Sequence, residues 1–181
     1  MTILYDGAHL SSVLNDVSEK LKNYLQDELP ENIIFVGIIT NGVFFAKRMK
    51  DKLKQHDFQI ESPIMELDIS LYRDDLAKRK DYISLGSSSI EMNLDNKHVI
   101  LFDDVLSTAR TARAALNAIF DYGRPKKVSF VVLFDRQNRQ VPIEPNITGE
   151  VVDVDNNLRI NVEFLEVVGD DKVVLGDMVF T

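Results

Sequence analysis

The chain has 181 residues, no cysteine and a formal net charge of −8, so one domain with a single sizeable core is favoured and disulfide or thiolate chemistry is excluded. The negative charge argues against broad nonspecific binding of nucleic acid, which needs clustered Lys and Arg, although it leaves room for a local basic patch. The composition is that of a soluble globular protein, and no apolar run is long enough to span a bilayer. Because a signal-peptide pattern is also missing, we expect one cytoplasmic domain over residues 1–181.

A helix, a strand and a second helix are predicted at the start of the chain. Residues 7–29 keep a helical period of apolar side chains that Pro30 ends, which predicts an amphipathic helix covering a sheet. The apolar run 33–39 predicts a buried strand, and a helix over 44–53 follows after a short loop. This loop is a candidate ligand site, with an ordinary Asn-Gly turn as the competing interpretation. Its residues are Thr40, Asn41 and Gly42.

A half-buried strand is predicted over 64–70, where apolar and polar residues alternate. The polar segment after it contains Arg73 and the basic run 78–80, which is equally well read as a solvated surface. Residues 82–92 predict a hairpin around three small residues, and a turn over 95–97 leads into the next strand.

The most informative stretch runs from Val99 to Thr111. Four apolar residues predict a strand buried on both faces, two adjacent carboxylates end it, and a loop with three hydroxyls leads into a helix. That helix carries apolar residues on one face and ends at Gly123 and Pro125. The polar residues of interest are Asp103, Asp104, Ser107, Thr108, Arg110 and Thr111, with Ala109 among them.

The chemistry of this stretch has two halves. A helix N-terminus offers unpaired N–H groups and a partial positive charge, which suit a phosphate, and Arg110 adds charge. Asp103 and Asp104, when ionised, only accept hydrogen bonds, which suits sugar hydroxyls or a divalent cation. Together the two halves fit a ribose 5-phosphate. The competing interpretation is that the carboxylates simply end a strand and that Thr111 caps a helix.

The apolar run 128–134 predicts a further strand, which completes a βαβ unit with a right-handed crossover. Asp135 and Arg136 follow it, and the prolines within 137–145 exclude a central strand there. Two apolar runs near the end of the chain predict a terminal hairpin. The three histidines lack companion ligands at metal spacing, so we expect no structural metal site. The hairpin runs are 162–167 and 172–175.

These motifs resemble a known family. Val99–Thr111 is similar to the thirteen-residue phosphoribosyl pyrophosphate motif of type I phosphoribosyltransferases. Residues 67–76, Gly123-Arg124-Pro125 and residues 133–143 are similar to the PyrR family, and the resemblance covers nearly the whole chain. Members of that family are uracil phosphoribosyltransferases that also regulate pyrimidine operons by binding messenger RNA.

The resemblance implies an α/β type I phosphoribosyltransferase fold: a central, mostly parallel sheet flanked by helices, with a mobile lid hairpin and a small hood. The lid would begin after Tyr72, and the hood would include the loop 137–145 and residues 146–153. The implied reaction transfers a 5-phosphoribosyl group from phosphoribosyl pyrophosphate to uracil, as in pyrimidine salvage, with transfer to another nucleobase as the alternative. Mg²⁺ would be the cofactor, and a homodimer or larger assembly is implied.

The family's functional residues map onto the motifs already described. Asp103 and Asp104 would hold the ribose hydroxyls, directly or through Mg²⁺, and Arg73 would reach the pyrophosphate. Asp135 and Arg136 would lie at the base and hood. The 5-phosphate would lie on Ser107, Thr108, Ala109, Arg110 and Thr111, and the pyrophosphate on Thr40, Asn41 and Gly42.

Three departures from the family pattern keep alternatives open. PyrR proteins usually carry Arg-Thr-Arg-Gly where this chain has Ile-Thr-Asn-Gly at 39–42, and the segment 149–153 lacks the usual hood Lys. Ala109 replaces a Gly, which imposes strain if that residue needs a positive φ and is harmless if it is helical. Besides the enzyme, we therefore consider a nucleotide-sensing RNA-binding regulator and a homologue that binds nucleotide without turnover.

Overall fold

A computed structural model of the chain describes residues 2–72 and 93–177. Arg73, the basic run 78–80 and the predicted hairpin over 82–92 lie outside the described residues. None of the helices in the described ranges has the length and apolar character required to cross a bilayer.

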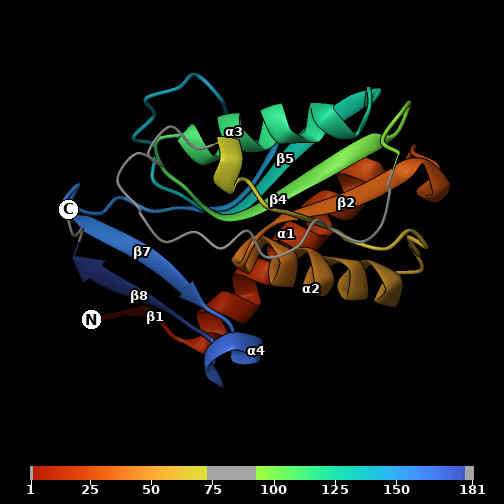
Figure 1. Ribbon diagram of the computed structural model, residues 1–181. Coiled ribbons are helices and arrows are strands. Elements are labelled where there is room, and N and C mark those ends of the chain that lie inside the picture. Colours follow the sequence, from red (N-terminus) through yellow and green to blue (C-terminus); the bar gives the residue numbers. More distant parts are fainter. Residues whose placement is uncertain (1, 73–92, 178–181) are drawn as a thin grey trace.

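A five-stranded parallel sheet forms the centre of the molecule (Figure 1). Its strand order is β3-β2-β4-β5-β6, so the direction of winding reverses between β2 and β4. Ligands of open α/β sheets bind beyond the carboxyl ends of the strands at such a reversal. The strands are β2 (Ile33–Ile38), β3 (Met65–Leu67), β4 (His98–Leu106), β5 (Lys127–Asp135) and β6 (Ile147–Val151).

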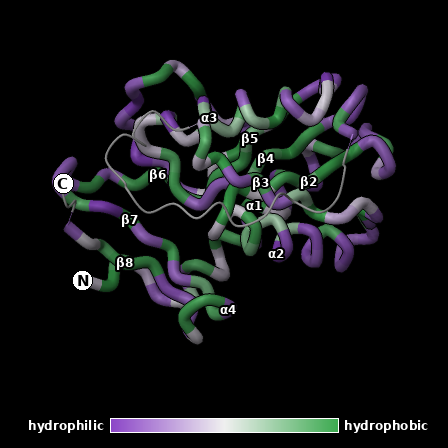
Figure 2. Tube along the Cα trace, viewed as in Figure 1, coloured by the Kyte–Doolittle hydropathy of each residue, from purple (hydrophilic) through white to green (hydrophobic). Residues whose placement is uncertain are grey.

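Helices cover both faces of the central sheet. On one face, α1 (Gly7–Leu25) and α2 (Asn41–Gln55) share a core with inward side chains such as Phe35 and Phe102, whose ring centroids lie 4.7 Å apart. On the other face, α3 (Arg110–Ile119) packs a row of alanines on the apolar side chains of β4 and β5. Figure 2 shows the central strands as mostly hydrophobic, with polar residues on the outer sides of the helices. Because both faces are covered, the central strands are nearly continuously apolar.

A second, smaller sheet lies beside the first and is antiparallel, in the order β1-β8-β7. It is built from β1 (Thr2–Tyr5), β7 (Leu158–Glu163) and β8 (Lys172–Asp177), with the short helix α4 (Leu165–Val168) between the last two. The predicted terminal hairpin is therefore confirmed, with a helical turn in its connection. Arg48 of α2 joins this sheet to the main body through two salt bridges, to Glu166 at 2.6 Å and to Asp171 at 2.8 Å.

Several predicted boundaries are wrong by a few residues. The first helix ends at Leu25 rather than at residue 29, and the third strand of the chain spans only Met65–Leu67. Asp103 and Asp104 do not end their strand, because β4 continues through them to Leu106. Short 3-10 turns cover three of the connections: η1 (Pro30–Asn32), η2 (Ser70–Tyr72) and η4 (Phe120–Tyr122).

The placement of residues 146–153 in the hood is also wrong, because Ile147–Val151 pairs in parallel with β5 as the outer strand of the central sheet. Its polar sequence hides this role. A Cβ at Gly149 would lie 2.5 Å from the carbonyl oxygen of Leu133 and 2.6 Å from Val13 of α1. The close packing of α1 on this strand therefore requires a residue without a side chain, which weakens the apolar signal of a strand.

The N-terminus of α2 packs very closely against the strands behind it. A Cβ at Gly42 would lie 2.3 Å from the carbonyl oxygen of Phe102, and one at Gly37 would lie 2.5 Å from the Cα of Val43. Residues 41 and 42, which the sequence predicts to be loop, instead form the first turn of this helix. Gly42 therefore lets the backbone of β4 lie directly against the first turn of the helix.

We expect Gly42→Ala to lower the free energy of unfolding by about 2–3 kcal/mol, since backbone must shift to admit the methyl group. Gly176→Ala is the matched control, because a Cβ there meets only a side-chain atom at 3.4 Å. That control should change stability by no more than about 1 kcal/mol. Urea unfolding with an unchanged m-value measures both, and equal effects would contradict the close packing.

Candidate functional site

The candidate site lies where β2 and β4 diverge, at the carboxyl edge of the central sheet. Three segments meet there: the end of β4 with the following loop, the first turn of α2, and β7 of the small sheet, which packs against β4. The βαβ turn predicted to carry the chemistry is thus at the topological switch point, as expected for an α/β ligand site.

Asn41 connects these segments through its side-chain amide. Its Nδ2 donates to Oδ2 of Asp104 at 2.7 Å and to the backbone carbonyl of Val162 at 2.9 Å. An amide nitrogen carries two hydrogens, so both donors of Asn41 are used within the protein. In this structure Asn41 therefore positions Asp104 and β7, and its role at a pyrophosphate remains a prediction.

Asp104 is held by neutral hydrogen-bond donors. Oδ2 accepts from Asn41, and Oδ1 accepts from the backbone N–H of Val105 at 2.9 Å. Desolvation raises the pKa of Asp104, and these hydrogen bonds with the more distant charge of Arg159 only partly oppose that shift. A carboxylate desolvated in this way gains from a cation or from sugar hydroxyls, which replace the lost water.

Asp103 is 8% exposed and lies on the opposite side of the strand from Asp104. Alternation along β4 places Leu101 in the core under α3 and Phe102 in the core under α1 and α2, so the two carboxylates follow opposite faces. Oδ1 of Asp103 accepts from the backbone N–H of Asp104 at 3.1 Å. The two carboxylates predicted to act together thus have separate surroundings.

The residues that could hold Mg²⁺ are these two aspartates. Within 2–72 and 93–177, no group of three or more His, Cys, Asp or Glu side chains converges on one point. Magnesium is commonly bound by one or two carboxylates together with substrate phosphates and water, so a donor set limited to these two carboxylates fits a metal that arrives with its phosphate ligand.

The predicted phosphate loop forms a tight turn between β4 and α3. Ala109 has φ 67° and ψ 11°, so it lies in the left-handed region, and this residue precedes the first turn of α3. The strained alternative for Ala109 is therefore the one observed. Adjacent residues of opposite handedness turn their N–H groups toward the same side, which makes a concave anion site at a helix N-terminus.

The hydroxyl and charged side chains of this turn have different surroundings. Ser107 Oγ donates to Asn138 Oδ1 at 2.7 Å, and the exposed Arg110 donates through Nε to Gln140 Oε1 at 2.8 Å. Thr108 and Thr111 are partly buried in the same turn. The structure thus brings the five predicted phosphate residues together, while Thr40 is exposed and follows a cis peptide bond from Ile39.

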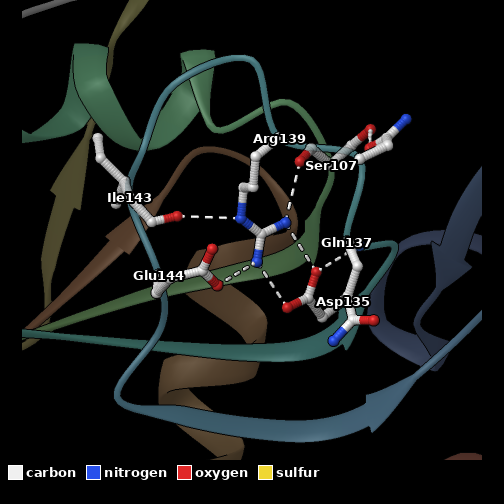
Figure 3. A network of polar contacts seen from close by, with 7 residues as sticks. Ser107, Asp135, Gln137, Arg139, Ile143 and Glu144 are labelled. Carbon is white, nitrogen blue, oxygen red and sulfur yellow. Dashed lines mark hydrogen bonds and ion pairs between the residues drawn. The ribbon is translucent and has the colours of Figure 1, made fainter.

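Asp135 and Arg136 have different roles in the fold. Asp135 is 4% exposed and forms a salt bridge with Arg139 at 2.6 Å, shown in Figure 3. Arg136 is 8% exposed, burial lowers its pKa, and Nη2 donates to the carbonyl of Asp155 at 3.1 Å. The Asp135 carboxylate is thus engaged by the protein itself, and a contact of either residue with a base remains a prediction.

The loop over 137–144, which the sequence predicts as loop and the resemblance places in the hood, contributes Asn138, Arg139 and Gln140 to the back of the phosphate turn, a contact that was not predicted. Its prolines correctly excluded a strand, but the spacing gave no indication of its partner. Only an Asp and an Arg four residues apart, Asp135 and Arg139, offered a signal of an ion pair.

Comparison with known proteins agrees with this geometry. Residues 9–169 match the family described as the phosphoribosyl transferase domain. Hypoxanthine phosphoribosyltransferase of Trypanosoma cruzi superposes with a TM-score of 0.71 at 14% identity, over 98% of this chain and 97% of that one. The chain therefore belongs to the phosphoribosyltransferases.

Curated relatives narrow the family. The bifunctional protein PyrR of Akkermansia muciniphila is 40% identical over 174 residues, which is 96% of this chain and 94% of that protein. The protein of the same name from Limosilactobacillus fermentum is 35% identical over 95% of this chain and 96% of its own length. Within the phosphoribosyltransferases, the chain belongs to the PyrR family.

We expect Ala109→Gly to change the free energy of unfolding by less than about 1 kcal/mol. Relief of the left-handed strain, about 1–2 kcal/mol, is offset by the loss of a buried methyl group and by the greater freedom of Gly in the unfolded chain. Ala114→Gly in the middle of α3 gains no such relief and should cost distinctly more, about 1–2 kcal/mol. Equal losses in urea unfolding would argue against the left-handed conformation at Ala109.

We expect the melting temperature of metal-free Asp104→Asn, relative to that of the wild type, to be higher at pH 7.5 than at pH 5, although the amide also removes one of the two accepting oxygens. The native pKa of Asp104 is raised, so its charge destabilises the fold at neutral pH, and this cost disappears as the pH falls through that pKa. The melting temperature of the variant minus that of the wild type should therefore fall toward pH 5. The exposed Asp51→Asn serves as the control, and a difference that rises on acidification would contradict the shift.

Proposed function

We propose that the protein transfers the 5-phosphoribosyl group of phosphoribosyl pyrophosphate to uracil, releasing pyrophosphate. The observation that carries this proposal is the pairing of an anion-binding turn at 107–111 with the desolvated Asp104 at the switch point of a phosphoribosyltransferase fold. The choice of uracil is supported by the family membership and not by a contact to a base.

In this proposal the two ends of the ribose phosphate are held separately. The N–H groups of the turn and of the first turn of α3 bind the 5-phosphate, and the hydroxyls of Thr108 and Thr111 add donors. Asp104 accepts from a ribose hydroxyl or binds the metal that accompanies the donor. Mg²⁺, when bound, neutralises oxygens of the leaving pyrophosphate.

No side-chain nucleophile is needed for this reaction. The base nitrogen displaces pyrophosphate at C1 of the ribose, where positive charge develops in the transition state. Catalysis by the protein is then positioning and electrostatic stabilisation, which matches a site rich in hydrogen-bonding groups and free of cysteine. The Asn41–Asp104 hydrogen bond at 2.7 Å would keep the carboxylate oriented as the charge develops.

The test is the formation of uridine monophosphate from phosphoribosyl pyrophosphate, Mg²⁺ and labelled uracil. We expect product from the wild type and a fall in kcat/KM of at least about a hundredfold in Asp104→Asn, because a transition-state contact is lost. Asp51→Asn should keep wild-type activity. Binding of the donor without product would favour the homologue that has lost turnover, and other bases would then be compared.

We also propose a second role, in regulation, because the PyrR relatives are named bifunctional proteins. Lys97, Arg124, Lys126 and Lys127 lie near the amino ends of β4 and β5, at the opposite edge of the sheet from the candidate site. Binding of pyrimidine-leader RNA should weaken with salt and should be reduced by Lys126→Gln. Equal binding of a scrambled RNA would count against this role.

A further inference from the structure

The phosphate turn is supported from behind by the loop that follows β5. The backbone N–H groups of Gln140 and Val141 donate to the carbonyl of Thr108 at 3.0 and 3.1 Å. Arg139 donates through Nη1 to the carbonyl of Ser107 at 3.0 Å. Two successive carbonyls of the turn are thus bound by one loop.

Arg139 is the centre of this support, and Figure 3 shows it surrounded by acceptors. A guanidinium has five N–H donors. In addition to the Ser107 carbonyl, the acceptors are both carboxylate oxygens of Asp135, the carbonyl of Ile143 and the carboxylate of Glu144. One acceptor is available for each donor, and the Arg139 side chain is only 13% exposed. A residue used in this way has no donor left for a substrate phosphate.

The arrangement also fixes Asp135. Its Oδ1 accepts from Arg139 and from the backbone N–H of Gln137 at 2.8 Å, and its Oδ2 accepts from Arg139 at 2.6 Å. A bidentate pair with little exposure holds a defined geometry better than a surface ion pair does. Hydrogen bonding to Asp135 raises the pKa of Arg139, so the guanidinium stays charged through the neutral range.

An anion site built from backbone needs its N–H groups toward the ligand and its carbonyls away from it. The carbonyls of Ser107 and Thr108 are turned toward the 139–141 segment. The carbonyl of Ala109 accepts from the backbone N–H of Arg113 in α3 at 3.0 Å. Three consecutive carbonyls are therefore occupied by protein donors, and Arg139 supplies the donor to the first of them.

We infer that Arg139, held by Asp135, is a positioning residue for the 5-phosphate turn: it fixes the peptide planes of the turn without contacting the ligand. This inference rests on the proposed function, since it concerns how that site binds a phosphate. It also separates the two anion-binding regions, because Arg139 donates to the carbonyl of Ser107 and, among the described residues, its hydrogen bonds go to residues 107, 135, 143 and 144 and not to the first turn of α2.

The test compares two anions by calorimetry on the full chain: ribose 5-phosphate, and pyrophosphate with Mg²⁺. In Arg139→Gln we expect the dissociation constant for ribose 5-phosphate to rise at least about tenfold, since small misplacements of a positioned group are costly. The constant for pyrophosphate should change less than about twofold. Arg139→Lys keeps the charge without the five-donor fork and should weaken ribose 5-phosphate binding to an intermediate degree.

Arg48→Gln is the matched control for loss of stability. Arg48 is also a partly buried arginine, 17% exposed, with bidentate contacts to Asp171 and Glu166, but it lies away from the turn. It should reduce stability comparably and leave ribose 5-phosphate binding unchanged. Binding by Arg139→Gln that equals the wild type, or an equal loss in Arg48→Gln, would overturn the inference alone. Failure of the wild type to bind ribose 5-phosphate would overturn the proposed function and this inference with it.

Discussion

The site depends on the contact between the N-terminus of α2 and strand β4. Gly37 and Gly42 leave room for helix backbone to reach strand backbone, and a single methyl group at Gly42 would lie 2.3 Å from the carbonyl of Phe102. That approach brings the first residue of the helix, Asn41, within 2.7 Å of Asp104. The geometry of the candidate site is therefore set by close packing of regular elements, which are more rigid than loops.

Carboxylates that connect parts of the fold have different surroundings from Asp104 in the candidate site. At the joint between α2 and the small sheet, hydrogen bonds from Arg48 lower the pKa of both Asp171 and Glu166. Asp104 has neutral donors in direct contact, and desolvation raises its pKa. Carboxylates paired with an arginine stabilise the fold. A buried carboxylate without an adjacent opposite charge destabilises it, and a ligand that supplies a cation or hydrogen-bond donors can recover that free energy on binding. Such a cost at one residue is typical of functional sites, where stability and activity compete.

The sequence predicted the βαβ unit well, because long apolar runs on either side of an amphipathic segment are strong local signals, and the structure places its polar turn at the switch point of the sheet. The sequence-based prediction failed where tertiary packing overrides local pattern. Ile147–Val151 was missed as the outer strand of the central sheet because Gly149, which lets α1 pack closely, weakens the apolar pattern, and that packing contact cannot be read from the order of residues. The same holds for Asn41 and Gly42, whose Asn-Gly dipeptide favours a turn although the helix begins there. The sequence left the conformation of Ala109 open, since an alanine just before a helix is compatible with either a helical or a left-handed backbone.

Two different mechanisms position the two halves of the site. The phosphate turn is held through side chains of the loop after β5, with Arg139 and Asp135 at its centre. The Asp104 carboxylate is held by Asn41 at the start of α2. The same helix also contacts the small sheet: Asn41 donates to the carbonyl of Val162, and the Arg48 guanidinium lies 4.7 Å from the ring centroid of Phe164. One helix therefore sets the position of Asp104 and that of β7 together. In the proposed reaction, a substrate group that contacts the small sheet would therefore be aligned with the ribose at Asp104, because the same helix positions β7 and this carboxylate.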